Sequence, residues 1–264
     1  MQRSSIRAAS SYDDAQRKMA FLVNYYRWIY KHVRPYLVGQ VLELGCGAGH
    51  FLHHYVDQVE KVYAVDHDPI LLSRLEEKYS ENPVSVIRAD LRNDWNEFEY
   101  VKADIVLCMD ILEHIQDDDA FVKKAKARLR PCGLFIIKVP AQSKLFSEID
   151  RASGHYRRYD KRKLRKLFEA NGFSPVKLIY MNPVGSFVYR MKNSRRTTFS
   201  KTFSRNQLRM INLIMMFLPV LDRVPGLKGL SLIGIFRVKS HIMYDSSRIS
   251  VGPSISQILT SELW

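Results

Sequence analysis

Three glycines alternate with other residues in the segment 43–49, which reads ELGCGAG. Glycine adopts positive φ and lets a ligand approach the backbone closely. The spacing differs from the G-x-G-x-x-G pattern of pyrophosphate sites, because the third glycine comes one residue early. The acidic Glu43 disfavours a phosphate and suits a cationic part of a ligand. The loop therefore predicts a nucleotide-type ligand held by Glu43, Gly45, Cys46, Gly47 and Gly49.

Two further acids follow, each at the end of an expected strand. Asp66 ends the strand 61–65 about 20 residues after the loop, where a carboxylate binds ribose hydroxyls. Its alternative role is to cap the next helix, but Asp68 suits that role better. Asp90 follows the strand 84–87, where an acid accepts a hydrogen bond from an adenine amino group or serves as a simple turn carboxylate. The adjacent His67 and Leu91 are assigned to the same site.

The glycine loop, the ribose acid and the adenine acid each lie at the carboxyl end of a strand, where ligands of open α/β sheets bind. Together they favour S-adenosylmethionine over NAD, because S-adenosylmethionine lacks a phosphate and carries a sulfonium and an ammonium group. We therefore predict S-adenosylmethionine as the cofactor and no metal site. The three cysteines, Cys46, Cys108 and Cys132, are too widely spaced for a zinc site or a disulfide framework.

Candidate catalytic residues lie in two segments expected above the cofactor, 110–114 and 141–160. Methyl transfer from a sulfonium mainly requires alignment. A base is needed only when the acceptor is a hydroxyl or an ammonium group. We predict Asp110, His114 and His155 as catalytic residues, with Asp110 also contacting the cofactor. For His114, the alternative is a packing or cofactor-flanking role.

The segment 154–159 concentrates one histidine, two arginines and two tyrosines. One interpretation is acceptor recognition, with His155 as base or oxyanion partner and an arginine pairing with an anionic group. The other is a loop clamp, in which an arginine bonds Asp150 and the tyrosines pack. Under the first interpretation the acceptor-binding residues are Asp150, His155, Tyr156, Arg157, Arg158 and Tyr159.

Short apolar segments alternate with helical ones along the chain, which indicates a parallel sheet covered by helices on both faces. Strands are expected at 41–44, 61–65, 84–87, 104–108, 134–139, 176–181 and 232–238. Helices are expected at 12–35, 50–56, 69–79, 118–129 and 161–171. The organisation we predict is an N-terminal helical segment (1–35), a cofactor-binding core (36–182), a basic and amphipathic helical insertion (183–230), a last core strand (231–239) and a tail (240–264).

On its motifs the chain resembles the class I S-adenosylmethionine-dependent methyltransferases, in particular a bacterial small-molecule subgroup (type 11/12-like) with a G-H-x-R-R-Y loop. The motifs run from about residue 25 to 239. They are RWIY (27–30), VLELGCGAG (41–49), DILEHIQDD (110–118), LRPCG (129–133), VPA (139–141), DRASGHYRRY (150–159) and PGLKGLSL (225–232). Cys132 stands where the family usually has glycine. The resemblance implies a Rossmann-like α/β fold with a seven-stranded, mostly parallel sheet whose one antiparallel strand lies at 231–238.

The net charge of +14 is concentrated in the second half of the chain. Residues 1–150 carry 20 basic and 22 acidic side chains, whereas residues 151–264 carry 21 and 5. Basic residues followed by the apolar run 210–221 suit docking of 195–221 on an anionic membrane face, although a lid or dimer face has the same pattern. That run is too short to span a bilayer. The cysteine usage fits a reducing compartment, so we expect a cytoplasmic protein, peripheral at the inner membrane face.

The favoured function is methyl transfer from S-adenosylmethionine to a small-molecule, lipid-linked or glycan acceptor, at an oxygen atom. Enzymes of this superfamily that methylate nitrogen often have an Asn/Asp-Pro-Pro-Tyr motif after the fourth strand. Residues 110–113 read DILE at that place, so methylation of nucleobase amino groups is disfavoured. An RNA methyltransferase is the first alternative, but basic and aromatic residues do not interleave as a stacking platform, so nucleic acid is disfavoured. The second is a non-catalytic partner of a membrane glycosyltransferase that binds S-adenosylmethionine. The oligomeric state is not determined by these patterns.

Overall fold

The computed structural model describes residues 18–192 and 205–239, and its centre is a seven-stranded sheet in the order β3-β2-β1-β4-β5-β7-β6. The parallel strands are β1 (Gln40–Leu44), β2 (Lys61–Asp66), β3 (Val84–Arg88), β4 (Ala103–Met109) and β5 (Leu129–Pro140). Strand β7 (Ser231–Val238) pairs antiparallel with β5 and with β6 (Phe173–Met181). The predicted α/β fold and the antiparallel strand at 231–238 are confirmed.

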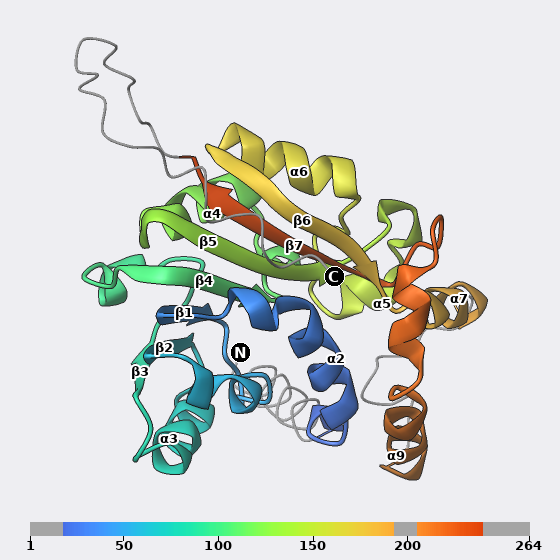
Figure 1. Cartoon of the computed structure of the whole chain (residues 1–264), viewed down its shortest axis with the longest axis horizontal. Helices are drawn as coiled ribbons and strands as arrows, with labels where there is room; N and C mark the ends of the chain where they lie inside the picture. Colours follow the sequence, from blue (N-terminus) through green and yellow to red (C-terminus); the bar gives the residue numbers. More distant parts are fainter. Residues whose placement is uncertain (1–17, 193–204, 240–264) are drawn as a thin grey trace, which may run out of the picture.

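Helices cover both faces of this sheet, as Figure 1 shows. Helices α2 (Val23–Val33) and α3 (Pro69–Lys78) contribute to one hydrophobic cluster, through residues such as Trp28 and Leu72. Helices α4 (Asp118–Lys126) and α6 (Lys161–Ala170) contribute to the other, through residues such as Phe121 and Phe168. Because successive strand residues point to opposite faces, each strand serves both clusters.

Several segments gather beyond the carboxyl ends of β5 and β6. They include α5 (Glu148–Ala152), α7 (Pro183–Lys192), α9 (Arg205–Ile214) and the 3-10 helix η7 (Leu218–Arg223). In Figure 1 they form the right-hand edge of the molecule. Within the predicted helical insertion, 183–230, the described residues include α7, α9 and η7, whereas 224–230 is not helical. The predicted tail at 240–264 lies outside the described residues.

Three expected helices differ from those in the structure. The segment 50–56 forms no α-helix but two 3-10 turns, η2 (Leu52–His54) and η3 (Val56–Gln58). A 3-10 turn places residues i and i+3 on one side, and Leu52 and Tyr55 are both buried in this way. Helix α4 ends at Lys126 because β5 already begins at Leu129. In the described part of the first expected helix, 20–22 is not helical and α2 begins at Val23.

Candidate active site

The glycine loop between β1 and β2 needs its glycines. Gly45, Gly47 and Gly49 have φ angles of 77°, 52° and 68°, a region that L side chains rarely adopt. A Cβ at Gly45 would lie 2.2 Å from Cδ1 of Ile111. The N–H groups of Gly45 and Cys46 donate to the carbonyl of Val65, at 2.8 and 3.0 Å, so the loop is attached to the end of β2. The geometry agrees with the predicted close approach of a ligand to this backbone.

Glu43 is buried at the end of β1, where the Tyr55 hydroxyl donates to its Oε2 at 2.7 Å. Burial raises the pKa of Glu43 to about 7, the hydrogen bond from Tyr55 lowers it and nearby Asp66 raises it. Neither of these two neighbours is a cation. A ligand that brings a positive charge would stabilise the ionised form, which is the chemistry predicted for this residue.

Asp66 connects the glycine loop to β2. Its Oδ2 accepts the N–H of Gly47 at 2.8 Å, and its Oδ1 accepts the N–H of Asp68 at 3.1 Å. His67 Nδ1 lies 3.1 Å from the same Oδ1. A carboxylate offers about four acceptor positions. These contacts therefore leave room for one further donor such as a ribose hydroxyl, and ribose binding remains a prediction.

Asp68, as predicted, caps α3, because its Oδ1 accepts the N–H groups of Ile70 and Leu71. Asp90 lies beyond the end of β3 and binds Arg92, whose Nη2 is 2.6 Å from Oδ2. The carboxylate of Asp90 remains 27% exposed, and Leu91 beside it is buried. Asp90 is therefore accessible for the predicted contact with an adenine amino group. This contact remains a prediction.

Asp110, directly after β4, has φ of 56° and is half-exposed. Its carboxylate forms an ion pair with the Lys138 ammonium on β5, which lies 5.4 Å from the ring centroid of Tyr25. Burial disfavours the charge of Lys138, but Asp110 and Tyr25 outweigh that effect and raise its pKa. Lys138 was missed by sequence reasoning, although a lysine inside the apolar segment 134–139 is a signal that could have found it.

The two predicted catalytic histidines meet in space. The rings of His114 and His155 are perpendicular, with centroids 4.6 Å apart. Glu113, buried beside them, has an Oε2 atom without a hydrogen-bond partner among the described residues. Nδ1 of His155 lies 3.1 Å from Oδ1 of Asp150. Burial and then the neighbouring His155 lower the pKa of His114.

Polar atoms of Arg158 and Tyr159 in the G-H-x-R-R-Y loop, and of Asp150 in the preceding helix α5, are bonded inside the chain. Nε of Arg158 donates to both oxygens of Asp150 at 2.9 Å, and the Tyr159 hydroxyl donates to Asp118 at 2.9 Å. All three residues are buried, so their contacts are those of the loop clamp. Acceptor contact remains a prediction for exposed Tyr156 and for His155 and Arg157, whose side chains are 18% and 31% exposed.

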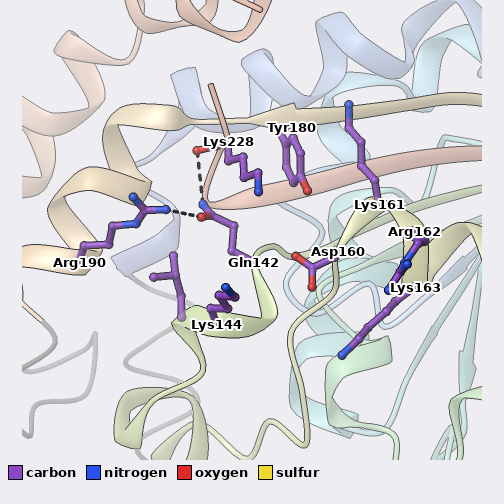
Figure 2. A pocket seen from close by; sticks show the side chains of 10 residues that line it. Gln142, Lys144, Asp160, Lys161, Arg162, Lys163, Tyr180, Arg190 and Lys228 are labelled. Atoms are coloured by element: carbon purple, nitrogen blue, oxygen red, sulfur yellow. Dashed lines mark hydrogen bonds between the residues drawn. The ribbon is translucent and has the colours of Figure 1, made fainter. Parts of the chain in front are cut away.

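Sequence reasoning also missed a basic cavity of about 440 Å³ beyond the carboxyl ends of β5 and β6. Figure 2 shows cationic side chains lining it from several segments. Its lining residues are Gln142, Lys144, Leu145, Asp160, Lys161, Arg162, Lys163, Tyr180, Arg190 and Lys228. Six of these are cationic and one is acidic. The cavity thus offers a concentrated positive field to an anion.

The arrangement fits S-adenosylmethionine. The loop has the positive φ angles of a close backbone approach, and Glu43 lacks a cation among the groups that shift its pKa. Asp66 is the last residue of β2 and Asp90 follows the neighbouring strand β3, so both lie at the carboxyl ends of these strands, as ribose and adenine contacts require. When bound, the cofactor supplies a methyl group on a sulfonium. In this structure, Glu43 would hold its cationic part and Asp66 its ribose.

A family model described as a methyltransferase domain matches residues 16–178. A protein of Mycolicibacterium smegmatis named a probable S-adenosylmethionine-dependent methyltransferase is 27% identical over 139 residues, which cover 50% of this chain and 51% of that protein. The ubiquinone biosynthesis O-methyltransferase of Proteus mirabilis is 28% identical over 96 residues, which cover 36% of this chain and 39% of that enzyme. The chain thus spans about half, or less, of the length of these curated relatives.

Two solved structures share the fold at low sequence identity. The N-methyltransferase NodS of Bradyrhizobium japonicum, in complex with S-adenosyl-L-homocysteine, has a TM-score of 0.53 and 12% identity, with 81% of this chain and 85% of that chain covered. An S-adenosylmethionine-dependent methyltransferase of Clostridium acetobutylicum has a TM-score of 0.55 and 13% identity, with coverages of 90% and 100%. The family match extends over more than half of the chain and includes the glycine loop and both strand-end acids. This protein therefore belongs to the methyltransferase domain family and carries an S-adenosylmethionine-dependent methyltransferase domain of the class I, Rossmann-like type.

Proposed function

We propose that the protein methylates an oxygen atom of a lipid-linked or glycan small molecule. We further propose that this acceptor carries a phosphate-type anion. The observation that supports this acceptor class is the basic cavity, with six cationic side chains against one acid. Burial lowers the pKa of Lys161, one of these side chains. An anionic ligand there would stabilise the charged form of Lys161.

The G-H-x-R-R-Y loop leads from the two histidines toward the cavity. At one position of this loop His155 contacts His114, and a few residues later Asp160 lines the cavity. The Tyr159 carbonyl accepts the N–H of Gln142 at 2.9 Å, which fixes the loop against the end of β5. An acceptor with its anion in the cavity would therefore extend along this loop toward Asp110 and the two histidines.

Methyl transfer to a hydroxyl is an in-line displacement, for which alignment is the main requirement. Anchoring of the anion in the cavity supplies this alignment. The hydroxyl proton must also be removed, and Asp110, His114 and His155 are the groups proposed to assist this step. The sulfur leaves as a neutral thioether, so no group is needed to stabilise it.

Labelled S-adenosylmethionine with separate lipid, glycan and RNA extracts tests the acceptor class. We expect label in the lipid or glycan fraction. In the double variant Lys161→Glu/Arg190→Glu, KM for that acceptor should rise at least tenfold, because charge-assisted hydrogen bonds are each worth roughly 1.5 to 3 kcal/mol. Lys78→Glu/Lys124→Glu, which reverses two exposed lysines outside the cavity, is the matched control. Label in RNA alone, or equal KM values in the two double variants, would reject the proposal.

We also propose that the protein docks on an anionic membrane surface, where a lipid-linked acceptor would be presented. Among the described residues, no helix is long and apolar enough to cross a membrane. Large apolar side chains nevertheless lie exposed on α7, α9, η7 and the turn between α9 and η7. They include Phe187, Met191, Met210, Leu213, Phe217 and Val220. Exposed Arg209 and Arg223 lie on the same segments. Residues 195–204 of the predicted docking segment lie outside the described part.

A further inference from the structure

A cluster of two histidines and one carboxylate lies just beyond the carboxyl end of β4. Glu113, His114 and His155 each offer a ligand atom, and these atoms all lie within 4.8 Å of one another. Glu113 and His114 belong to the 3-10 turn η5 (Leu112–His114) after β4, whereas His155 comes from the G-H-x-R-R-Y loop. We propose that these three side chains bind a divalent transition-metal ion such as Zn²⁺.

The buried carboxylate provides independent support. Glu113 is 1% exposed, and its Oε2 has no hydrogen-bond partner among the described residues. A carboxylate in such surroundings is costly unless it is paired with a charge or coordinates a metal. A divalent ion between Glu113 and the two histidines would supply the missing partner.

The backbone holds the two segments of the cluster together. The N–H of Tyr156 donates to the carbonyl of Glu113 at 2.7 Å, which fixes the loop beside η5. Ligand atoms around one zinc ion are about 3 to 4 Å apart, since each lies about 2 Å from the metal. Side-chain movements of roughly 1 Å would therefore bring the three groups to coordination distance.

His155 is oriented through one ring nitrogen, which leaves the other nitrogen for a metal. Nδ1 of His155 lies 3.1 Å from Oδ1 of Asp150. Asp150 is itself fixed by Arg158 and by the Tyr189 hydroxyl, which donates at 2.8 Å. The backbone of Gly154 lies beside the ring of His114, since a Cβ at Gly154 would lie 3.7 Å from Nδ1 of that ring. Carboxylates and carbonyls orient metal-binding histidines in the same way.

A site of two histidines and one carboxylate leaves coordination positions open. Building on the proposed O-methylation, one of these positions would take the acceptor hydroxyl. The metal lowers the pKa of a bound hydroxyl, so the proton leaves to solvent water and the oxygen becomes an oxyanion. Its electron pair forms the new O–C bond while the electrons of the C–S bond go to sulfur. The two histidines would then assist removal of the proton as ligands of the metal.

Cobalt titration of the full chain tests the site, since Co²⁺ takes zinc ligands and absorbs visible light. After treatment with EDTA, we expect the parent to bind one Co²⁺ with the visible bands of nitrogen and oxygen ligands. Glu113→Gln and His155→Gln should each weaken binding at least tenfold in calorimetry. The control His53→Gln, which changes an exposed histidine outside the cluster, should bind Co²⁺ like the parent.

Three results would overturn the metal site: no Co²⁺ uptake by the parent, unchanged affinity in Glu113→Gln and His155→Gln, or an equal loss in His53→Gln. Should a cluster variant fail to fold, the parent alone decides the question through its visible bands and through the rise in its unfolding temperature with Co²⁺. The outcome is separable from that of the proposed function. Cobalt binding that depends on Glu113, without label transfer to any extract, would leave the site standing and reject the acceptor class.

Discussion

Glu43 illustrates how a single buried residue links the cofactor site to stability. Its pKa is about 7 in the folded chain, above the ordinary value of 4.5. Between these two pH values the unfolded chain has released a proton that the folded chain keeps. The free energy of unfolding therefore falls as the pH rises from 4.5 to 7. Above pH 7 the folded protein retains a buried negative charge, which suits a cationic ligand.

Glu43→Gln should remove this pH-dependent loss of stability, because glutamine keeps an acceptor for Tyr55 without the charge. The difference in free energy of unfolding between variant and parent should grow by on the order of 3 kcal/mol from pH 4 to pH 8 in urea titrations. Calorimetry should also show weaker S-adenosylmethionine binding by the variant. Glu76→Gln, at an exposed position of α3, is the control. A difference that stays constant with pH would contradict the burial argument.

The glycine loop allows strain and steric conflict to be separated. Gly45 and Gly226 both have positive φ, at 77° and 84°, so alanine strains the backbone at either position. Only at Gly45 would the new Cβ meet a side chain, that of Ile111, whereas nothing lies within 4 Å at Gly226. We therefore expect Gly45→Ala to lower S-adenosylmethionine affinity at least tenfold in calorimetry, and Gly226→Ala to leave it unchanged. Equal affinities in the two variants would show that the loop does not contact the cofactor.

At the scale of elements, the sequence predicts those strands and helix ends that depend on neighbouring residues in the chain. The seven strands follow from short apolar runs, and the start of α3 follows from Asp68 and Pro69, which cap and begin it. The turns after Gly49 were predicted wrongly as a helix, because helical spacing alone does not distinguish an α-turn from a 3-10 turn in so short a segment. In the structure the burial of Leu52 and Tyr55 accompanies the 3-10 form.

Contacts between distant segments could not be predicted in this way. His114 and His155 were considered separately as bases, and only the fold brings them together beside Glu113. The basic cavity likewise combines α6, β6, α7 and the loop before β7. The spacing of residues along the chain does not show which distant residues lie close together in the fold. The charge excess of the second half was visible in the sequence, but the place where it converges was not.

Asp222 joins three elements that are far apart in the sequence. Its carboxylate accepts the indole N–H of Trp28 at 2.6 Å and the backbone N–H of Asn182 at 2.9 Å, and it lies 2.9 Å from Nε2 of His32. Asp222→Ala leaves buried donors without an acceptor, at about 1 to 3 kcal/mol each. We expect urea unfolding to show a loss of about 2 to 4 kcal/mol. A loss no larger than that of Glu77→Ala, at an exposed position, would contradict this role.

At the scale of the whole molecule, the two edges of the sheet differ in what they expose. The carboxyl edge of β5 and β6 carries the basic cavity and, nearby, the exposed apolar side chains of α7 and α9. A membrane-bound acceptor with an anionic group matches both features, since apolar burial and attraction to anionic lipids act together at membrane interfaces. Exposed Val38 and Tyr100, by contrast, lie before the amino ends of β1 and β4.

Sedimentation with anionic vesicles distinguishes these two edges. The double variant Leu213→Ser/Phe217→Ser removes two exposed apolar side chains, one from α9 and one from the turn after it. We expect at least a fivefold loss of vesicle-bound protein. Each apolar side chain buried in the membrane would contribute roughly 1.5 to 3 kcal/mol to binding. Val38→Ser/Tyr100→Ser removes two side chains of similar exposure at the opposite edge and should leave binding unchanged. Binding by the parent should also weaken as salt is added, since the lipid charge is then screened. Equal binding by both double variants would mean that the apolar side chains of α9 do not enter the lipid, and the proposed docking surface would be rejected.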